Sequence, residues 1–391
     1  MPIAYWRRTS GHDAVMLSAK GLIHVLGAVV AVSFILRQAL PTGNLPFLVA
    51  AIIGGIALLA FMMMRERIGI EVHLIILMLI VIYIMSLMRN DFVQGRVFLP
   101  IMLANLGLAI GVLKFPKIFR FLKWLFFGLF TYFVLCYLAG VSLDDVFSLS
   151  RNHISTLFIM IAAALLLVEY NLTGKVILLP AILAFIASVL ARGSGGMIAS
   201  SFLLLGLSFV WIFGERLYSR ILLILLVSVV LMGVGFVTML EVSEFVALLA
   251  EQLYGTEYSQ DVRDRFDLER LLGGDRRYTI WAAYFHSLSP IDWFTGTRLN
   301  EEYAGVTNVH SSYLLLHARA GLLVLPVFLI LIWVAYRLFV RSLAMFVVYV
   351  AILLRSASDT VIFGVAPFDW VLLALILSTF ATGSKSDVGY R

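Results

Sequence analysis

Residues 70–88 read IEVHLIILMLIVIYIMSLM, a run in which Glu71 is the only charged side chain. At 1.5 Å per residue, a helix of this length crosses the roughly 30 Å hydrocarbon core of a bilayer. Similar runs recur along the 391 residues, of which 62% are hydrophobic and 13% charged, with a mean hydropathy of +1.01. Because so few polar residues cannot cover a soluble globule, we expect an all-α polytopic membrane protein.

The apolar runs predict about twelve transmembrane helices. They lie near residues 20–36, 45–64, 70–88, 97–113, 120–140, 153–168, 174–191, 196–213, 220–240, 313–336, 342–354 and 360–380. This division predicts three parts: residues 1–240 with the first nine helices, a large loop of residues 241–312, and residues 313–391 with the last three helices and a tail.

The distribution of cations predicts the orientation, because cytoplasmic loops are rich in lysine and arginine. Both termini and alternate loops carry the larger set, which includes every lysine: Arg7, Arg8, Lys20, Arg65, Arg67, Lys114, Lys117, Arg120, Lys123, Lys175, Arg216, Arg220, Arg337, Arg341, Lys385 and Arg391. We therefore expect both termini to be cytoplasmic and the loop 241–312 to be outside, in the periplasm of a Gram-negative cell.

Three further features narrow the class of protein. Cys136 is the only cysteine and lies in a predicted span, which argues against a disulfide framework or a thiol-rich metal site. The net charge of +6 is explained by cytoplasmic cations near anionic headgroups, so no nucleic-acid partner is expected. Residues 1–20 lack the apolar core of a cleavable signal, so the first helix is expected to remain as an anchor.

The loop 241–312 has its own predicted helices. Residues 241–253 have an amphipathic spacing that suggests a helix along the membrane surface. A second helix is expected over Asp275–Ser287, and Pro290 and Gly296 are expected to end it and start a turn.

All cations of this loop are arginines: Arg263, Arg265, Arg270, Arg276, Arg277 and Arg298. The planar guanidinium matches phosphate oxygens in a bidentate arrangement and stays protonated, so this usage suits phosphate recognition. The alternative is that these arginines pair with the many acidic residues of the loop on a solvated surface.

Arg192 lies at the outer end of a predicted span and is followed by Gly193-Ser194-Gly195-Gly196. Glycines let the backbone approach an anion closely, and the next helix begins there with free amides, so this corner could hold a pyrophosphate. An arginine that snorkels to the interface beside an ordinary hairpin turn is the alternative.

His310 lies where the large loop re-enters the membrane. A titratable group at that point suits proton transfer at a bilayer surface, with Asn308 and Ser311 as candidate orienting groups. A histidine at a helix start can equally be a cap or a satisfied polar contact.

These stretches resemble a known family. Arg277-Tyr278-Thr279-Ile280-Trp281, Pro290, Gly296 and Asn308-Val309-His310-Ser311-Ser312-Tyr313-Leu314 are similar to the signature region of the O-antigen ligase and polymerase superfamily. Ala191-Arg192-Gly193 is similar to that family's Ser-Arg-Gly element. Ala191 replaces the usual serine, and Ser311 replaces the asparagine that commonly follows the histidine.

The resemblance implies a GT-C-like membrane glycosyltransferase of the bacterial inner membrane. Its donor would be a glycan on undecaprenyl pyrophosphate, and its acceptor either another lipid-linked glycan or lipid A-core, with a chain-length regulator as a further partner. His310 would be catalytic, and Arg192, Arg277, Arg276, Asn308, Ser311 and Tyr313 would bind substrate. No Asp-x-Asp occurs in the chain, so we expect neither a metal nor another cofactor.

The sequence leaves three functions open. A polymerase is favoured over a ligase, because the Asn308 to Leu314 stretch looks more like exopolysaccharide and O-antigen polymerases. A transporter of lipid-linked glycans is more remote, because transporters usually carry discontinuous helices and polar residues in mid-membrane, whereas here intramembrane charges look scarce.

Overall fold

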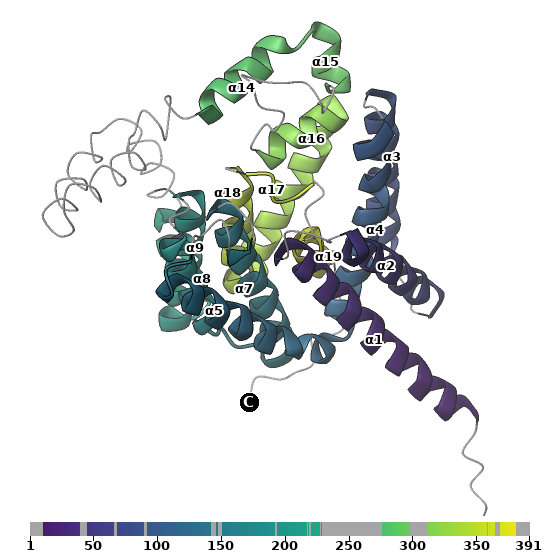
Figure 1. Cartoon of the computed structure of the whole chain (residues 1–391), viewed down its shortest axis with the longest axis vertical. Helices are drawn as coiled ribbons and strands as arrows, with labels where there is room; N and C mark the ends of the chain where they lie inside the picture. Colours follow the sequence, from purple (N-terminus) through teal and green to yellow (C-terminus); the bar gives the residue numbers. More distant parts are fainter. Residues whose placement is uncertain are drawn as a thin grey trace, which may run out of the picture.

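The computed structural model describes residues 11–39, 45–65, 69–89, 92–141, 146–147, 151–191, 194–216, 218, 220–226, 228, 276–297, 311–357, 359–363 and 368–380. Every regular element within these ranges is a helix (Figure 1). The expected all-α class is therefore confirmed for the part of the chain that the structure describes.

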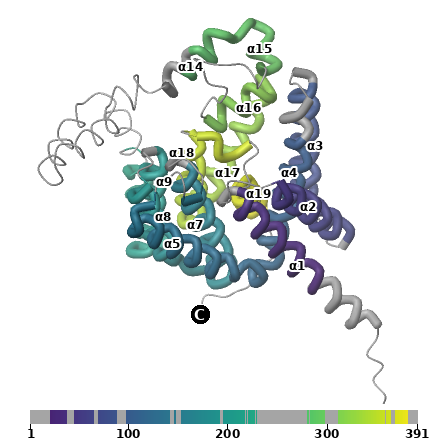
Figure 2. The backbone as a smooth tube through the Cα atoms, in the orientation of Figure 1, coloured from purple at the N-terminus to yellow at the C-terminus, as the bar shows by residue number. Residues whose placement is uncertain are grey.

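Two groups of helices flank a C-terminal group (Figure 2). The first group is α1 (Gly11–Ala39), α2 (Leu45–Arg65), α3 (Ile70–Arg89) and α4 (Phe92–Lys114). The second group is η1 (Pro116–Phe121), α5 (Leu122–Leu138), α7 (Arg151–Thr173), α8 (Leu179–Leu190) and α9 (Ser194–Phe213). Between them lie α16 (Ser312–Ala320), η2 (Gly321–Leu323), α17 (Val324–Arg341), α18 (Leu343–Ala357) and α19 (Asp369–Phe380), while α14 (Arg276–Ser287) and α15 (Pro290–Thr295) lie across one end of the bundle.

Helix α7 is the centre of the second group. Every residue from 154 to 168 is buried, and α5, α8, α9 and α18 all pack against this helix. The three alanines Ala162, Ala163 and Ala164 allow close approach of the neighbouring helices.

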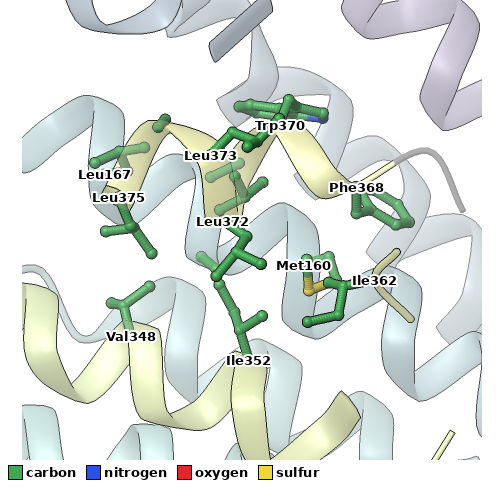
Figure 3. Packing of buried hydrophobic residues seen from close by; sticks show 14 of the residues in the cluster. Met160, Leu167, Val348, Ile352, Ile362, Phe368, Trp370, Leu372, Leu373 and Leu375 are labelled. Carbon is green, nitrogen blue, oxygen red and sulfur yellow. The ribbon is translucent and has the colours of Figure 1, made fainter. Parts of the chain in front are cut away.

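Helices α18 and α19 join the two groups. Helix α18 packs against α9, and α19 packs against α4. Val348 and Ile352 of α18 and Leu372 and Leu375 of α19 belong to one apolar cluster that also includes Met160 of α7 (Figure 3). The C-terminal helices therefore hold the bundle together from within.

Helices α16 and α17 form a hairpin. The chain turns at Gly321, which has a φ of +53°, and the ring of Tyr313 packs 5.6 Å from that of Phe328. Residues fifteen positions apart would be separated by about 22 Å along one straight helix, so α16 must fold back along α17. The predicted span 313–336 is thus two antiparallel helices, because Gly321 adopts a conformation that ends α16.

Seven segments are long and apolar enough to cross a membrane in the described part of the chain: Leu45–Met64, Ile70–Leu87, Val97–Lys114, Pro116–Leu138, His153–Thr173, Gly195–Phe213 and Ser312–Arg341. Shorter apolar helices lie at Gly21–Arg37, Leu179–Leu190, Leu343–Ala357 and Asp369–Phe380. The protein is therefore built as a polytopic membrane protein, while the number of twelve helices stays a prediction. Of the expected span 220–240, only residues 220–226 and 228 are described.

Two predicted boundaries differ from the structure. The last helix begins at Asp369 instead of residue 360, because residues 359–363 are irregular and bond to other helices. Pro290 begins α15, since Ser289 and Asp292 form a capping box in front of it, and Gly296 ends this short helix.

The hairpin turn supplies a test of the fold. A Cβ at Gly321 would lie 2.1 Å from the carbonyl oxygen of Phe294, and its backbone conformation is one that L-residues rarely adopt. We expect Gly321→Ala to lower the free energy of unfolding by about 1–3 kcal/mol. Gly128→Ala is the control, because nothing lies within 4 Å of its added Cβ. Thermal unfolding in detergent measures both, and equal midpoints would contradict the close approach.

Candidate functional site

The start of α16 is joined to the segment between α18 and α19 through Ser312. The Ser312 hydroxyl donates to the carbonyl of Asp359 at 2.9 Å and accepts the amides of Val361 at 2.8 Å and Ile362 at 3.1 Å. The Ser312 amide also donates to the Asp359 carbonyl at 3.1 Å. Four hydrogen bonds therefore hold the helix start that directly follows the predicted catalytic position 310.

Asp359 is itself held by a buried ion pair. Its carboxylate lies 2.8 Å from the guanidinium of Arg355, and the two side chains are 6% and 0% exposed. A second carboxylate oxygen accepts the amide of Thr360 at 2.8 Å. Each partner satisfies the other, which is the condition under which charges are tolerated in a low-dielectric interior.

Asp359 follows α18, which packs against α7. The buried ion pair therefore lies at the end of a helix that contacts the centre of the second group.

Near His153, α7 meets the first turn of α9. A Cβ at Gly196 would lie 2.2 Å from the Cβ of Ser155, so only glycine allows these two helices to approach so closely. Ala191, which ends the α8 side of the same connection, is fully buried. The α9 side of Arg192 is consequently fixed against α7.

A second polar layer surrounds Phe363, which has a φ of +58°. The Arg319 guanidinium donates to the Phe363 carbonyl at 3.0 Å, and the Phe363 amide donates to Asp369 at 2.7 Å. Arg319 is 1% exposed and lies 4.6 Å from the ring centroid of Phe98. A strained backbone position is thus clamped at both polar groups by two buried charges.

Asn105 connects this layer to α4. Its side-chain oxygen accepts the amide of Trp370 at 3.0 Å, and its side-chain nitrogen donates to the carbonyl of Ile101 at 2.9 Å. Asn105 lies in the middle of the span Val97–Lys114, so α19 begins at mid-membrane depth. Irregular backbone is tolerated at such depth because protein surrounds it.

Helix α14 is tied to α16 through His317. The Tyr284 hydroxyl lies 2.6 Å from His317 Nδ1, and His317 Nε2 lies 3.3 Å from the carbonyl of Trp293. Ile280, Tyr284 and Ala318 form a small buried cluster there.

The structure describes some of the predicted site residues fully, some as backbone only and some not at all. His310, Asn308 and Arg192 lie outside the described residues, and Arg276 and Arg277 are described as backbone only, in the first turn of α14. Their roles stay predictions.

Two predicted residues are described fully. Ser311 is the buried N-cap of α16 and makes no capping hydrogen bond through its side chain. The Tyr313 hydroxyl donates to the carbonyl of Leu353 at 2.9 Å, which ties α16 to α18. This contact gives Tyr313 a packing function, and its substrate contact stays a prediction.

Sequence reasoning did not select the buried groups Ser312, Arg319, Arg355, Asp359 and Asp369. Four of these groups are ionisable, and all four are buried within the protein, while the expectation that intramembrane charges are scarce stays a prediction. The available signal was the presence of Arg319 and Asp369 inside predicted spans, since a charge within a span is expensive unless it has a partner.

Comparisons with family models, with curated proteins and with solved structures gave no match for this chain.

The Ser312 contacts predict a specific loss of stability. Ser312→Ala leaves the amide of Ile362 without an acceptor and removes one of the two acceptors of the Val361 amide, so we expect the free energy of unfolding to fall by about 1–3 kcal/mol. Ser208→Ala is the control, because its hydroxyl bonds only to the carbonyl four residues earlier. Similar unfolding midpoints for the two variants would show that the Ser312 contacts are dispensable.

The ion pair predicts non-additive effects. Arg355→Leu leaves a buried carboxylate unpaired and should cost about 3–5 kcal/mol, whereas replacing Arg355 and Asp359 together by leucine should cost less than Arg355→Leu alone. Unfolding of the two single variants and the double variant in one detergent measures the coupling. A double variant that loses the sum of the single losses would contradict a direct pair.

Proposed function

We propose that this chain is a membrane glycosyltransferase that polymerises oligosaccharide repeat units carried on undecaprenyl pyrophosphate. The substrate class rests on the resemblance of the Arg192, Arg277 and His310 stretches to the O-antigen ligase and polymerase superfamily. The proposed location is the bacterial inner membrane, with cytoplasmic termini and a periplasmic active site.

One structural observation supports bringing these stretches together. Ser312, two residues after His310, bonds to Asp359. Asp359 follows α18, which packs against α7 and α9. Near the start of α7, Ser155 lies against Gly196 of α9, four residues after Arg192. The flank of His310 is therefore held by α18, and the flank of Arg192 by two helices that pack against α18.

The reaction assigns a distinct task to each residue. A hydroxyl oxygen of the acceptor sugar attacks the anomeric carbon, the bond from that carbon to the pyrophosphate oxygen breaks, and the configuration inverts. His310 accepts the hydroxyl proton. Arg192 and Arg277 stabilise the negative charge that develops on the departing undecaprenyl pyrophosphate, and Arg276 is the alternative to Arg277.

The acceptor distinguishes polymerase from ligase. A polymerase transfers the growing glycan to another lipid-linked unit, and a ligase transfers it to lipid A-core. Both would use the same leaving group, so the arginines serve either function equally.

A transporter of lipid-linked glycans is the second candidate, and a specific observation favours it. The α16–α17 hairpin and the mid-membrane start of α19 are discontinuous elements, and the buried Arg319 and Asp369 lie beside them. Transporters often bind substrate at such breaks. In the proposed transferase, these charges clamp Phe363 and support the start of α16 instead.

The purified protein in proteoliposomes, supplied with a repeat unit on undecaprenyl pyrophosphate, provides the decisive assay. We expect products longer than the donor glycan together with free undecaprenyl pyrophosphate. His310→Ala should lower the rate by roughly 10²–10⁴-fold, because a proton acceptor contributes this much to such steps. His286→Ala is the matched control, since His286 is an exposed histidine of α14.

Two results of the assay separate the candidate functions, and two more test the proposed residues. Transfer only to added lipid A-core identifies a ligase. An unaltered donor that crosses the bilayer identifies a transporter. Normal polymer from His310→Ala would show that His310 is not the base. Normal polymer from Arg277→Lys with none from Arg276→Lys would show that Arg276, and not Arg277, stabilises the leaving group.

A further inference from the structure

Helix α15 and the adjoining end of α14 expose several large apolar side chains. Ile291 and Phe294 are 61% and 62% exposed, and Trp293 and Phe285 are 43% and 45% exposed. The rings of Phe285 and Trp293 stack with centroids 5.8 Å apart. We call these four residues the aromatic face. A soluble surface rarely gathers so much apolar area without a partner.

The aromatic face is rigidly attached to the tip of the α16–α17 hairpin. The Thr297 amide donates to the carbonyl of Ala318 at 2.9 Å. A Cβ at Gly296 would lie 2.3 Å from that same carbonyl oxygen. A Cβ at Gly321 would lie 2.1 Å from the carbonyl oxygen of Phe294. These two backbone approaches hold α15 directly against η2, at the end of the bundle seen in Figure 1.

The length of α17 indicates where the tip of the hairpin lies relative to the two boundaries of the membrane. Helix α17 has 18 residues and therefore rises about 27 Å, close to the roughly 30 Å thickness of bilayer hydrocarbon. Arg337 and Arg341 lie at one end of α17, where cations mark a boundary with headgroups. The opposite end, at η2, consequently lies near the other boundary.

Large apolar side chains are also exposed on α17 and η2. Leu325, Leu329 and Ile332 of α17 are 52%, 67% and 65% exposed, as expected of a lipid-facing surface. Leu322 of η2, the element against which α15 packs, is 38% exposed. The hairpin that carries α15 therefore exposes apolar surface as well.

Charge does not oppose contact between α15 and lipid. Asp292 is the only ionisable residue between positions 287 and 297. Its carboxylate accepts both the amide and the hydroxyl of Ser289 in the capping box. Tryptophan and phenylalanine at the end of a span are typical of side chains that lie at the headgroup level.

We propose that the aromatic face of α14 and α15 docks onto the lipid bilayer itself, with Ile291 and Phe294 inserted among the acyl chains at the boundary of one leaflet. The large polar loop is then attached to the membrane at its C-terminal end, directly ahead of the segment that leads to α16. This inference does not depend on glycosyl transfer.

Spin labels on single cysteines test the depth. In a Cys136→Ser background, Ile291→Cys and Phe294→Cys would be labelled in the full chain and reconstituted into phosphatidylethanolamine and phosphatidylglycerol vesicles. Oxygen partitions into lipid, and a water-soluble nickel chelate does not. We expect the ratio of oxygen to nickel accessibility to be several-fold higher at both positions than at His286→Cys, an exposed polar position of α14.

Leu329→Cys on α17 is the hydrocarbon reference, and its ratio should exceed those at positions 291 and 294, which lie closer to the headgroups. Ratios at 291 and 294 equal to that at 286 would overturn the proposal, because both side chains would then be in water. Shielding of both positions from oxygen and from nickel would also overturn it, because a protein surface would then cover the face.

Discussion

The contact between Ser312 and the backbone of Asp359, Val361 and Ile362 joins two irregular parts of this membrane bundle. Backbone amides in a bilayer cannot be left without partners, so an irregular segment at this depth needs acceptors from neighbouring helices. One serine hydroxyl satisfies two such amides, and the Arg355–Asp359 pair satisfies the charges beside it. The position of α16 depends on these bonds.

Close helix packing connects these irregular segments to the rest of the bundle. Helix α7 is surrounded on all sides, and Gly196 lets α9 approach it where the α8–α9 connection ends. On the other side, Asn105 binds the start of α19 to α4. Small residues and single polar contacts of this kind replace the hydrophobic driving force, which is weak between helices in lipid.

Buried ionisable side chains hold the irregular backbone of this region. Arg319, Arg355, Asp359 and Asp369 each lie where an unpaired charge would be costly, and each has an ionisable group of opposite sign near it. The architecture alone does not distinguish transfer from transport, and the identity of the groups at the α16 start carries the functional proposal.

The sequence by itself determined the solvent and the helical class, because long apolar runs such as residues 70–88 are stable only as helices in lipid. It also located the helix of residues 276–287 and the junction at residues 310–313. It did not determine the hairpin at Gly321 or the late start of α19 at Asp369, because hydropathy is the same for a straight helix and for one that folds back. Only the tertiary structure decided that Ser312 meets Asp359, Val361 and Ile362, because these contacts join residues far apart in the chain that no local pattern relates.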